Sequence, residues 1–254
     1  KRSKNIVLIK TEKEIKIMKE GGEILSAILH KLINATKVGI TTFDLEDLAR
    51  ELLSSYKVKA SFLGYDGYPA VLCTSINEEI VHGLPSERII EAGDLVKIDM
   101  GVVHKGFHTD SAYTVLVPGG ANVDVNNKLV NVTKEALKIG IAKAKIGNTL
   151  GDLGAAIQAY VEAQGFNVVR DLIGHGIGRE LHEDPQVPNY GRAGQGLKLM
   201  EGMVIAIEPM VVVGKPQIAD GKDGFAYITK DLSYSAHFEH TIAITKNGPL
   251  TITE

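Results

Sequence analysis

The sequence predicts a mixed α/β (α+β) fold in which one plan, two helices followed by strands, is used twice. Three observations predict it: apolar residues at helical spacing in four segments, strand-like apolar segments after each pair of these, and a partial repetition of the sequence about 108 positions further on. With 254 residues, 44% of them hydrophobic, the chain is long enough to bury a substantial core.

Four helices are expected from caps and apolar spacing. Three of them begin at a capping-box pattern, formed by Thr11 and Glu14, by Thr41 and Asp44, and by Thr149 and Asp152. The remaining one follows the break Pro118-Gly119-Gly120. The residues that give these helices an apolar face include Ile15, Met18, Leu25, Ile28, Leu29 and Leu32; Leu45, Leu48, Leu52 and Leu53; and Leu129, Val132, Ala136, Leu137 and Ile141.

The repetition relates two parts of the chain residue by residue. Lys37, Gly39, Thr41, Asp44 and Leu45 recur as Lys145, Gly147, Thr149, Asp152 and Leu153. At a shift of 109, "AGDLVKIDMGVV" aligns with "EGMVIAIEPMVV", so that Asp99 meets Glu208. We therefore expect a single domain over residues 1–254, made of two similar halves at about 11–117 and 122–254. The alternative is a pair of similar but unrelated helix-to-strand transitions.

Charge and cysteine content narrow the class of protein. A net charge of −3 gives no overall basic field for nucleic acid or anionic lipid. Cys73 is the only cysteine, and no apolar run approaches the length of a membrane span, so a cytoplasmic protein is expected. The lysines near the start are expected to form a solvated face: Lys1, Lys4, Lys10 and Lys13.

Acidic residues interrupt segments that otherwise resemble buried strands. In "DLVKIDMGVVHKGFHTDSAYTVLV", a hairpin turn centred on His104-Lys105 would place Asp99 opposite Asp110. Glu208 and Glu239 stand in two further apolar segments. Buried like charges repel each other unless a cation lies between them, and divalent cations prefer oxygen ligands.

A histidine adds a nitrogen donor to these acids. His175 stands among glycines in "LIGHGIGRELHE", and four carboxylates with one imidazole suit two metal ions. Each residue alone has a plain structural explanation, such as an edge aspartate or a satisfied histidine, but four acids in four apolar segments favour a metal centre. A phosphate-binding loop at "GHGIG" is disfavoured, because the segment lacks the ending of a P-loop.

At these residues the sequence resembles the bacterial-type (type I) methionine aminopeptidases. The resemblance covers nearly the whole chain and rests on "FLGYDGYPAVLCTSINEEIVHGLP", "IDMGVVHKGFHTDSAYTV", "GHGIGRELHEDPQVPNY", "GMVIAIEPM" and "LSYSAHFEHTIAI". It implies a pseudo-twofold "pita-bread" fold, with an antiparallel sheet core and outer helices. It also implies five metal ligands, which are Asp99, Asp110, His175, Glu208 and Glu239.

The resemblance implies roles for further residues. His82 and His182 would handle substrate, Glu208 would also move protons, and the methionine pocket would consist of Tyr65, Tyr68, Cys73 and Phe225, with His82 and His182 beside it. The family usually has tryptophan where Phe225 stands and phenylalanine where Leu181 stands, so a wider or softer pocket wall is expected.

The implied reaction is metal-assisted hydrolysis of the first peptide bond after an N-terminal methionine, when the second residue is small. Two divalent ions per chain are implied, with Co²⁺, Mn²⁺ and Fe²⁺ as main candidates and Zn²⁺ and Ni²⁺ as further ones. The expected partners are the N-termini of nascent polypeptides, with the ribosome as a further candidate, and the expected state is a monomer without direct nucleic-acid or membrane contacts.

Other relatives of this fold give alternative functions. The stretch from His175 to Glu208 is too short for the insertion of type II enzymes, and one cysteine cannot build the zinc-binding extension of eukaryotic type I enzymes. A proline dipeptidase shares the ligand set, but usually has a sizeable additional N-terminal domain. A non-catalytic peptide- or histone-binding relative would be expected to lack ligands, and a nucleic-acid-binding relative would need a basic patch.

Overall fold

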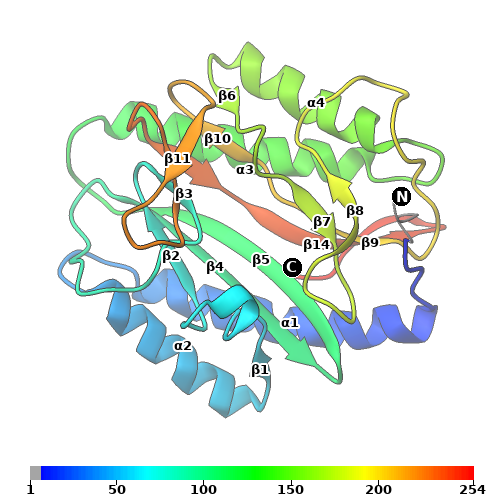
Figure 1. The fold of residues 1–254 in the computed structure, drawn as a ribbon, viewed down its shortest axis with the longest axis horizontal. Helices are drawn as coiled ribbons and strands as arrows, with labels where there is room; N and C mark the ends of the chain where they lie inside the picture. The colour runs from blue at the N-terminus through cyan, green and yellow to red at the C-terminus, as the bar shows by residue number, and fades with distance from the viewer. Residues whose placement is uncertain (1–6) are drawn as a thin grey trace.

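In a computed structural model, which describes residues 7–254, the helices form two pairs, and each pair packs against its own part of one large sheet (Figure 1). The four α-helices of the described residues are α1 (Glu12–Ala35), α2 (Thr42–Tyr56), α3 (Val123–Lys143) and α4 (Leu150–Ala163). The predicted helices and the α/β class are confirmed. None of these helices is long and apolar enough to cross a membrane.

The predicted caps form as the sequence indicates. The Thr41 hydroxyl accepts the Asp44 N–H at 3.1 Å, and the Thr149 hydroxyl accepts the Asp152 N–H at 3.2 Å. The Thr11 box at the start of α1 is also present. Helix α3 begins differently, since Asn122 has left-handed backbone angles and makes no side-chain cap.

The central sheet has nine strands in the order β1-β4-β5-β14-β9-β7-β8, with β2 added on β4 and β15 on β14, and its pairings are antiparallel. These strands are β1 (Lys59–Ala60), β2 (Cys73–Ile76), β4 (Leu95–His104), β5 (Phe107–Leu116), β7 (Gly174–Gly176), β8 (Glu183–Val187), β9 (Val204–Ile207), β14 (Glu239–Thr245) and β15 (Gly248–Thr251).

Two small sheets of three strands each flank the central one. Their orders are β13-β10-β6 and β11-β12-β3. Their strands are β3 (Glu79–Val81), β6 (Asn167–Val168), β10 (Met210–Val212), β11 (Ile218–Asp220), β12 (Tyr227–Thr229) and β13 (Ser235–His237), and a short 3₁₀ turn, η1, covers Tyr65–Gly67.

Strand alternation separates the core from the acidic residues. In β4, Val96, Ile98 and Met100 pack in the core beneath α1 and α2, while Ile242 and Ile244 of β14 pack in the core beneath α3 and α4. Because neighbouring strand residues point to opposite faces, Asp99 and Glu239 lie on the face away from the helices. The helices thus cover one face of the sheet and leave the other to the acids.

The predicted hairpin forms, but its predicted register is wrong by two residues. His104 pairs with Phe107, so the turn consists of Lys105 and Gly106, both with positive φ (49° and 82°). Such a two-residue turn matches the strand twist and favours glycine. Asp99 therefore pairs with Ala112, and Asp110 pairs with Gly101. A shift of two residues preserves the face, so both acids still lie on the same side.

Matched contacts occur in the two parts of the chain related by the repetition. Gly39 (φ 93°) donates its N–H to the Ile90 carbonyl, and Gly147 (φ 90°) donates to the Leu199 carbonyl. Isolated bridges also join Thr41 to Ile89 and Thr149 to Lys198. These contacts are consistent with two equivalent halves, and the division at about 11–117 and 122–254 stays a prediction.

The predicted solvated lysine face is wrong for Lys10. Its side chain is buried and forms an ion pair with Glu183, the first residue of β8. Lys13 is exposed as expected, whereas Lys1 and Lys4 lie outside the described residues. A lysine can be buried in this way because its partner is a carboxylate that would otherwise also lack a counter-charge.

Candidate metal centre and substrate pocket

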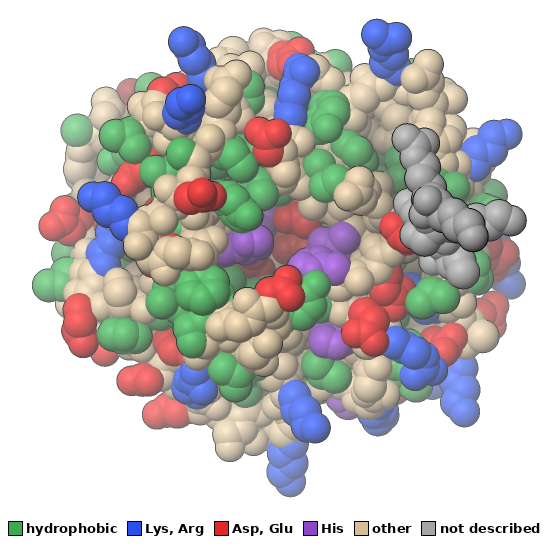
Figure 2. Space-filling view, in the orientation of Figure 1, with side chains coloured by type: hydrophobic (Ala, Val, Ile, Leu, Met, Phe, Trp, Pro, Cys, Tyr) green, Lys and Arg blue, Asp and Glu red, His purple; other side chains and the backbone are tan. Residues whose placement is uncertain are grey.

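A cavity of about 330 Å³ opens on the face of the sheet away from the helices. Figure 2 shows it as a hollow with histidines at its rim and acidic side chains deep inside. It brings together the eleven residues assigned from the sequence: Tyr65, Tyr68, Cys73, His82, Asp99, Asp110, His175, His182, Glu208, Phe225 and Glu239. Its lining also includes Phe62, Asp66 and Tyr227, which were not singled out from the sequence.

Strand pairing and hydroxyl groups bring the acids together. Asp99, Ala112 and Glu239 are lateral partners on β4, β5 and β14. The Thr241 hydroxyl accepts the Asp110 N–H at 3.0 Å and donates to the Asp110 carbonyl at 2.8 Å, so it fastens β5 to β14. These backbone hydrogen bonds hold Asp110 beside Glu239. The two carboxylates do not attract each other.

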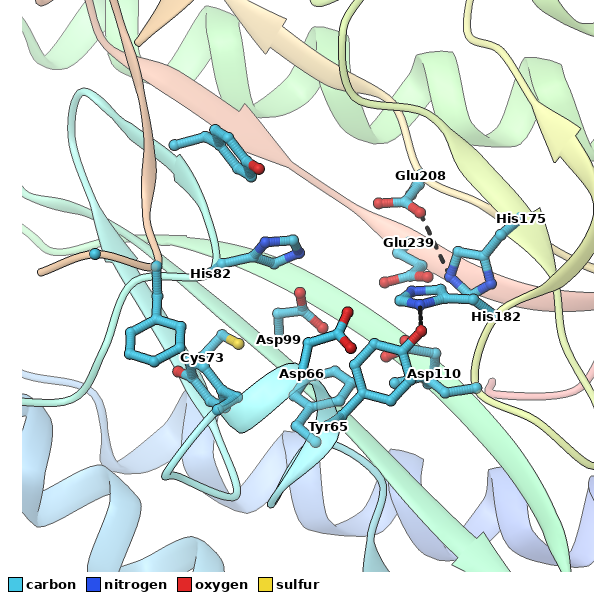
Figure 3. Close-up of a pocket in the computed structure, with 16 residues that line it drawn as sticks. Tyr65, Asp66, Cys73, His82, Asp99, Asp110, His175, His182, Glu208 and Glu239 are labelled. Atoms are coloured by element: carbon cyan, nitrogen blue, oxygen red, sulfur yellow. Dashed lines mark hydrogen bonds and ion pairs between the residues drawn. The ribbon is translucent and has the colours of Figure 1, made fainter. Parts of the chain in front are cut away.

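His175 presents a bare ring nitrogen to the acids. Its Nδ1 lies 2.8 Å from the Gly176 carbonyl, which can only accept, so Nδ1 carries the proton and Nε2 has the lone pair. Nε2 lies 3.7 Å from Oε1 of Glu208 (Figure 3). A lone pair that faces a carboxylate oxygen at this distance favours a positive species between them. Ligand histidines typically donate their other N–H to a carbonyl in this way.

The flanking glycines permit this position of His175. A Cβ on Gly174 would lie 2.3 Å from the Ala206 carbonyl oxygen, and one on Gly176 would lie 2.3 Å from that of Asp184. Larger residues would thus force β7 away from β8 and β9. The glycines in "GHGIG" therefore serve the close packing of strands around the histidine.

Burial and mutual repulsion disfavour the charged forms of these carboxylates. Burial, and next to it the charges of neighbouring acids, hold the pKa of Asp99, Glu208 and Glu239 well above their usual values. Burial likewise raises the pKa of Asp110 to about 7. Burial lowers the pKa of His175 to about 3, so this imidazole stays neutral. A neutral imidazole and acids that need a counter-charge are the electrostatic conditions of a cation site.

Unpaired oxygens give an independent test of whether the residues fit a metal. Oδ1 of Asp99, Oδ1 of Asp110 and Oε1 of Glu239 are buried and have no hydrogen-bond partner among the described residues. Buried polar atoms are normally paired, so three unpaired carboxylate oxygens in one cavity fit a bound cation. Two donor groups have ligand atoms within 4.8 Å of one another, namely Asp110, His175 and Glu239, and Glu208, His237 and Glu239.

His237 is a member of this cluster that the sequence analysis missed. It stands two residues before Glu239 in "SAHFEHT" and lies on β13, outside the central sheet. Its proximity to Glu239 in sequence was an available signal. Its position beside Glu208, however, depends on the pairing of His237 with Met210 of β10, which brings together distant parts of the chain.

The two other predicted histidines lie at the rim of the cavity. His82 follows β3 with a left-handed backbone (φ 62°), and Figure 3 shows its ring directed towards the cavity centre. His182 lies just before β8, with Nδ1 2.6 Å from the Tyr65 hydroxyl and its ring edge-to-face with His175. Burial lowers the pKa of both histidines, so both are neutral near pH 7. Each can then donate one hydrogen bond.

The other end of the cavity is apolar. Tyr68 and Cys73 are buried there in a cluster that also includes Phe62 and Leu181, and Phe225 packs against it. The Tyr68 and Phe225 rings are edge-to-face with centroids 5.3 Å apart. The Tyr68 hydroxyl lies within hydrogen-bond distance of the Leu72 and Gly83 carbonyls, which share its single proton, so its polar atom is satisfied. An apolar slot thus adjoins the acidic cluster directly.

Comparison with known proteins identifies the family. The model of metallopeptidase family M24 matches residues 16–246. The chain belongs to metallopeptidase family M24. It is 46% identical to a methionine aminopeptidase of Clostridium acetobutylicum over 98% of this chain and 99% of that protein. It is 43% identical to methionine aminopeptidase 1 of Bacillus subtilis over 96% of this chain and 97% of that protein. The resemblance to bacterial-type methionine aminopeptidases is thereby confirmed.

Solved structures of M24 relatives agree with the fold of this member. The methionine aminopeptidase of Thermotoga maritima superposes with a TM-score of 0.95 at 44% identity, covering 98% of this chain and 100% of that one. An Xaa-Pro dipeptidase of Bacillus anthracis superposes with a TM-score of 0.78 at 25% identity, covering 97% of this chain but 62% of that one. The expected pita-bread fold of this M24 protein is therefore confirmed.

Proposed function

We propose that this protein is a methionyl aminopeptidase that removes the N-terminal methionine from nascent proteins and peptides with a small second residue. One observation carries the proposal: an apolar slot and an acidic cluster share one cavity. The identity of 43% to 46% to methionine aminopeptidases over nearly the whole chain supports it.

Asp99, Asp110, His175, Glu208 and Glu239 are the residues that would hold two divalent ions. The unpaired oxygens, the raised carboxylate pKa values and the bare Nε2 of His175 support this assignment. When bound, the ions supply positive charge that offsets the carboxylates, acidifies water and polarises the substrate carbonyl. Oxygen donors with one imidazole suit Co²⁺, Mn²⁺ and Fe²⁺, with Zn²⁺ and Ni²⁺ as further candidates.

The chain's own residues then divide the remaining tasks. The slot formed by Tyr65, Tyr68, Cys73 and Phe225 holds the methionine side chain through apolar and sulfur contacts. Because this slot is adjacent to the acids, the substrate α-amine reaches the carboxylates, which favours a free N-terminus over an internal peptide bond.

Three residues would act at the reacting peptide bond. His82 and His182 each donate a hydrogen bond to the substrate carbonyl as negative charge develops on its oxygen. Glu208 accepts a proton from the attacking water and passes it to the leaving amine, a role that suits a carboxylate whose pKa is raised by burial. All three side chains line the cavity.

A proline dipeptidase is the second candidate, because Xaa-Pro dipeptidase of Bacillus anthracis shares the fold. The lower identity of 25%, and the 62% coverage of that longer chain, favour the methionyl aminopeptidase. We further propose a cytoplasmic monomer whose partners are nascent polypeptide N-termini, with the ribosome as a candidate contact.

A peptide assay tests the proposal. Purified protein is stripped with chelator, reloaded separately with Mn²⁺, Co²⁺ or Fe²⁺, and given Met-Ala-Ser, Met-Lys-Ser and Ala-Pro peptides. Release of methionine from Met-Ala-Ser alone is the expected result. Release of alanine from Ala-Pro in preference to methionine from Met-Ala-Ser would replace the proposal with the dipeptidase.

A further inference from the structure

The search for chemistry outside the assigned residues leads to His237. Its side chain is 1% exposed, and neither ring nitrogen has a hydrogen-bond partner among the described residues. Its backbone is fixed on both sides, because its N–H donates to the Thr114 hydroxyl at 2.8 Å and its carbonyl accepts from that hydroxyl at 2.7 Å. The ring is therefore held in place by β13 and β5 and does not rest on side-chain hydrogen bonds.

The His237 ring faces the carboxylate of Glu208. Nε2 of His237 lies 3.4 Å from Oε2 of Glu208, while Nε2 of His175 lies 3.7 Å from Oε1. Each oxygen of this carboxylate thus faces a different imidazole. His175 must present a lone pair, because its Nδ1 proton points to the Gly176 carbonyl. His237 has no such constraint and can place its proton on Nε2.

Leaving both nitrogens of a buried imidazole without a hydrogen-bond partner is unfavourable. A hydrogen bond between the His237 ring and the nearby Glu208 oxygen would therefore stabilise the folded protein. Nε2 of His237 and Oε2 of Glu208 are 3.4 Å apart, and a small rotation of the Glu208 carboxylate would bring them to the usual distance of a hydrogen bond. The charged form of Glu208 would then have a donor on Oε2 and the side of Oε1 free for a cation.

We propose that His237 is a positioning residue, which donates its Nε2–H to Oε2 of Glu208 and fixes the orientation of that carboxylate. The inference rests on the proposed role of Glu208 as metal ligand and proton carrier. A freely rotating Glu208 would offer the wrong oxygen to the ion or to the attacking water in part of the molecules. Groups that orient a ligand in this way typically change metal affinity or activity by about 10- to 100-fold when removed.

Two substitutions of His237 distinguish the effect of its N–H donor from the effect of its side-chain volume. His237→Leu keeps a similar volume but removes the donor, whereas His237→Gln keeps an N–H at the end of the side chain. His240→Gln is the matched control, since His240 lies on β14 with Nδ1 2.9 Å from the Thr253 hydroxyl and does not line the cavity. Thermal melting of the chelator-treated proteins checks that each variant folds.

Calorimetric titration with Mn²⁺ is the first measurement, because it does not depend on activity. His237→Leu is expected to weaken Mn²⁺ binding about 10- to 100-fold without changing the number of ions bound, and His237→Gln to restore most of the affinity. On Met-Ala-Ser, kcat should follow the same order while KM stays near that of wild type, because the methionine slot is untouched.

Electronic absorption of the Co²⁺-loaded proteins tests the rival role. The spectrum should be the same in wild type and His237→Gln if His237 does not coordinate the ion. A shifted spectrum or a lost ion in His237→Gln would make His237 a metal ligand and overturn the proposal. Wild-type Mn²⁺ affinity and kcat in His237→Leu would overturn it as well. If wild type releases no methionine, the proposed function fails, and the Mn²⁺ affinities still decide the role of His237.

Discussion

The metal-free protein should lose stability as the pH rises from 5 to 8, and Asp110 should contribute to this loss together with the other buried carboxylates of the cluster. Burial raises the pKa of Asp110 from 3.8 to about 7. Between these two values the folded state holds a proton that the unfolded state has released. The free energy of unfolding therefore falls as the pH rises through this window, and the full stability contribution is present only below pH 4.

The size of the effect follows from that pKa. A rise from 3.8 to about 7 corresponds to about 4 kcal/mol of unfavourable free energy once Asp110 is ionised at pH 8. Because the side chain is buried, solvent screening does not reduce this value strongly. Asp110→Asn removes the charge but leaves a buried amide, at a cost of about 1–3 kcal/mol. The variant should thus be about 1–3 kcal/mol more stable than wild type at pH 8 and within about 1.5 kcal/mol of wild type at pH 5.

Urea unfolding of chelator-treated protein at both pH values measures this difference. Asp47→Asn is the control, because Asp47 is exposed on α2. Saturating Mn²⁺ should reverse the order, since binding at 100 times Kd stabilises wild type by about 2.7 kcal/mol and the variant lacks one proposed ligand. If metal-free Asp110→Asn is less stable than wild type at pH 8, the idea that unbalanced charge destabilises the empty cluster is refuted.

Three further predictions concern activity. Exhaustive chelation should abolish peptidase activity, and Mn²⁺ titration should restore it with up to two ions per chain; full activity after chelation would contradict the metal centre. His82→Ala should lower kcat about 10²- to 10³-fold and leave the amount of bound metal unchanged. Asp110→Ala should lower both kcat and the amount of bound metal. Kinetic assays and metal analysis of the two variants measure these quantities. A near-normal kcat or lost metal in His82→Ala would show that His82 has another role. Met-Ala peptides should be cleaved and Met-Lys peptides not, and equal turnover in a methionine-release assay would refute the limit on the second residue.

Local patterns in the sequence were sufficient for the helices and for the acidic face of the sheet. Capping boxes and apolar spacing define where α1, α2 and α4 begin, because both depend on residues three or four positions apart. Asp99 and Asp110 could be placed on one face because strand alternation depends only on parity. For the same reason, the two acids lie on the predicted face even though the predicted register was wrong.

The exact hairpin turn and the contacts between distant segments were not obtained in this way. The turn at Lys105 and Gly106 differs by one residue from the predicted one, and that difference moves every pair of the hairpin by two. His237 reaches Glu208 only because β13 pairs with β10. Gly106 was a local signal for the hairpin turn, whereas the pairing of β13 with β10 leaves no periodic signal, since it depends on how separate elements pack.

The ion pair between Lys10 and Glu183 gives the most direct test of such a distant contact. Both side chains are almost fully buried, and Oε1 of Glu183 also accepts the N–H groups of Arg179 at 2.8 Å and Glu180 at 3.2 Å. The same carboxylate thus shapes the loop that leads to His182. Lys10→Met should destabilise the protein by about 3–5 kcal/mol in urea unfolding, because it leaves a buried charge without a partner.

A second variant shows where that free energy resides. If the unpaired charge is responsible, Lys10→Met combined with Glu183→Gln should recover most of the lost stability, because a neutral amide replaces the stranded carboxylate while its oxygen can still accept the N–H groups of residues 179 and 180. If the double variant is as unstable as Lys10→Met alone, the loss lies in the packing of the lysine side chain. A loss below about 1 kcal/mol in Lys10→Met, as for an exposed pair, would contradict the burial of this contact in solution.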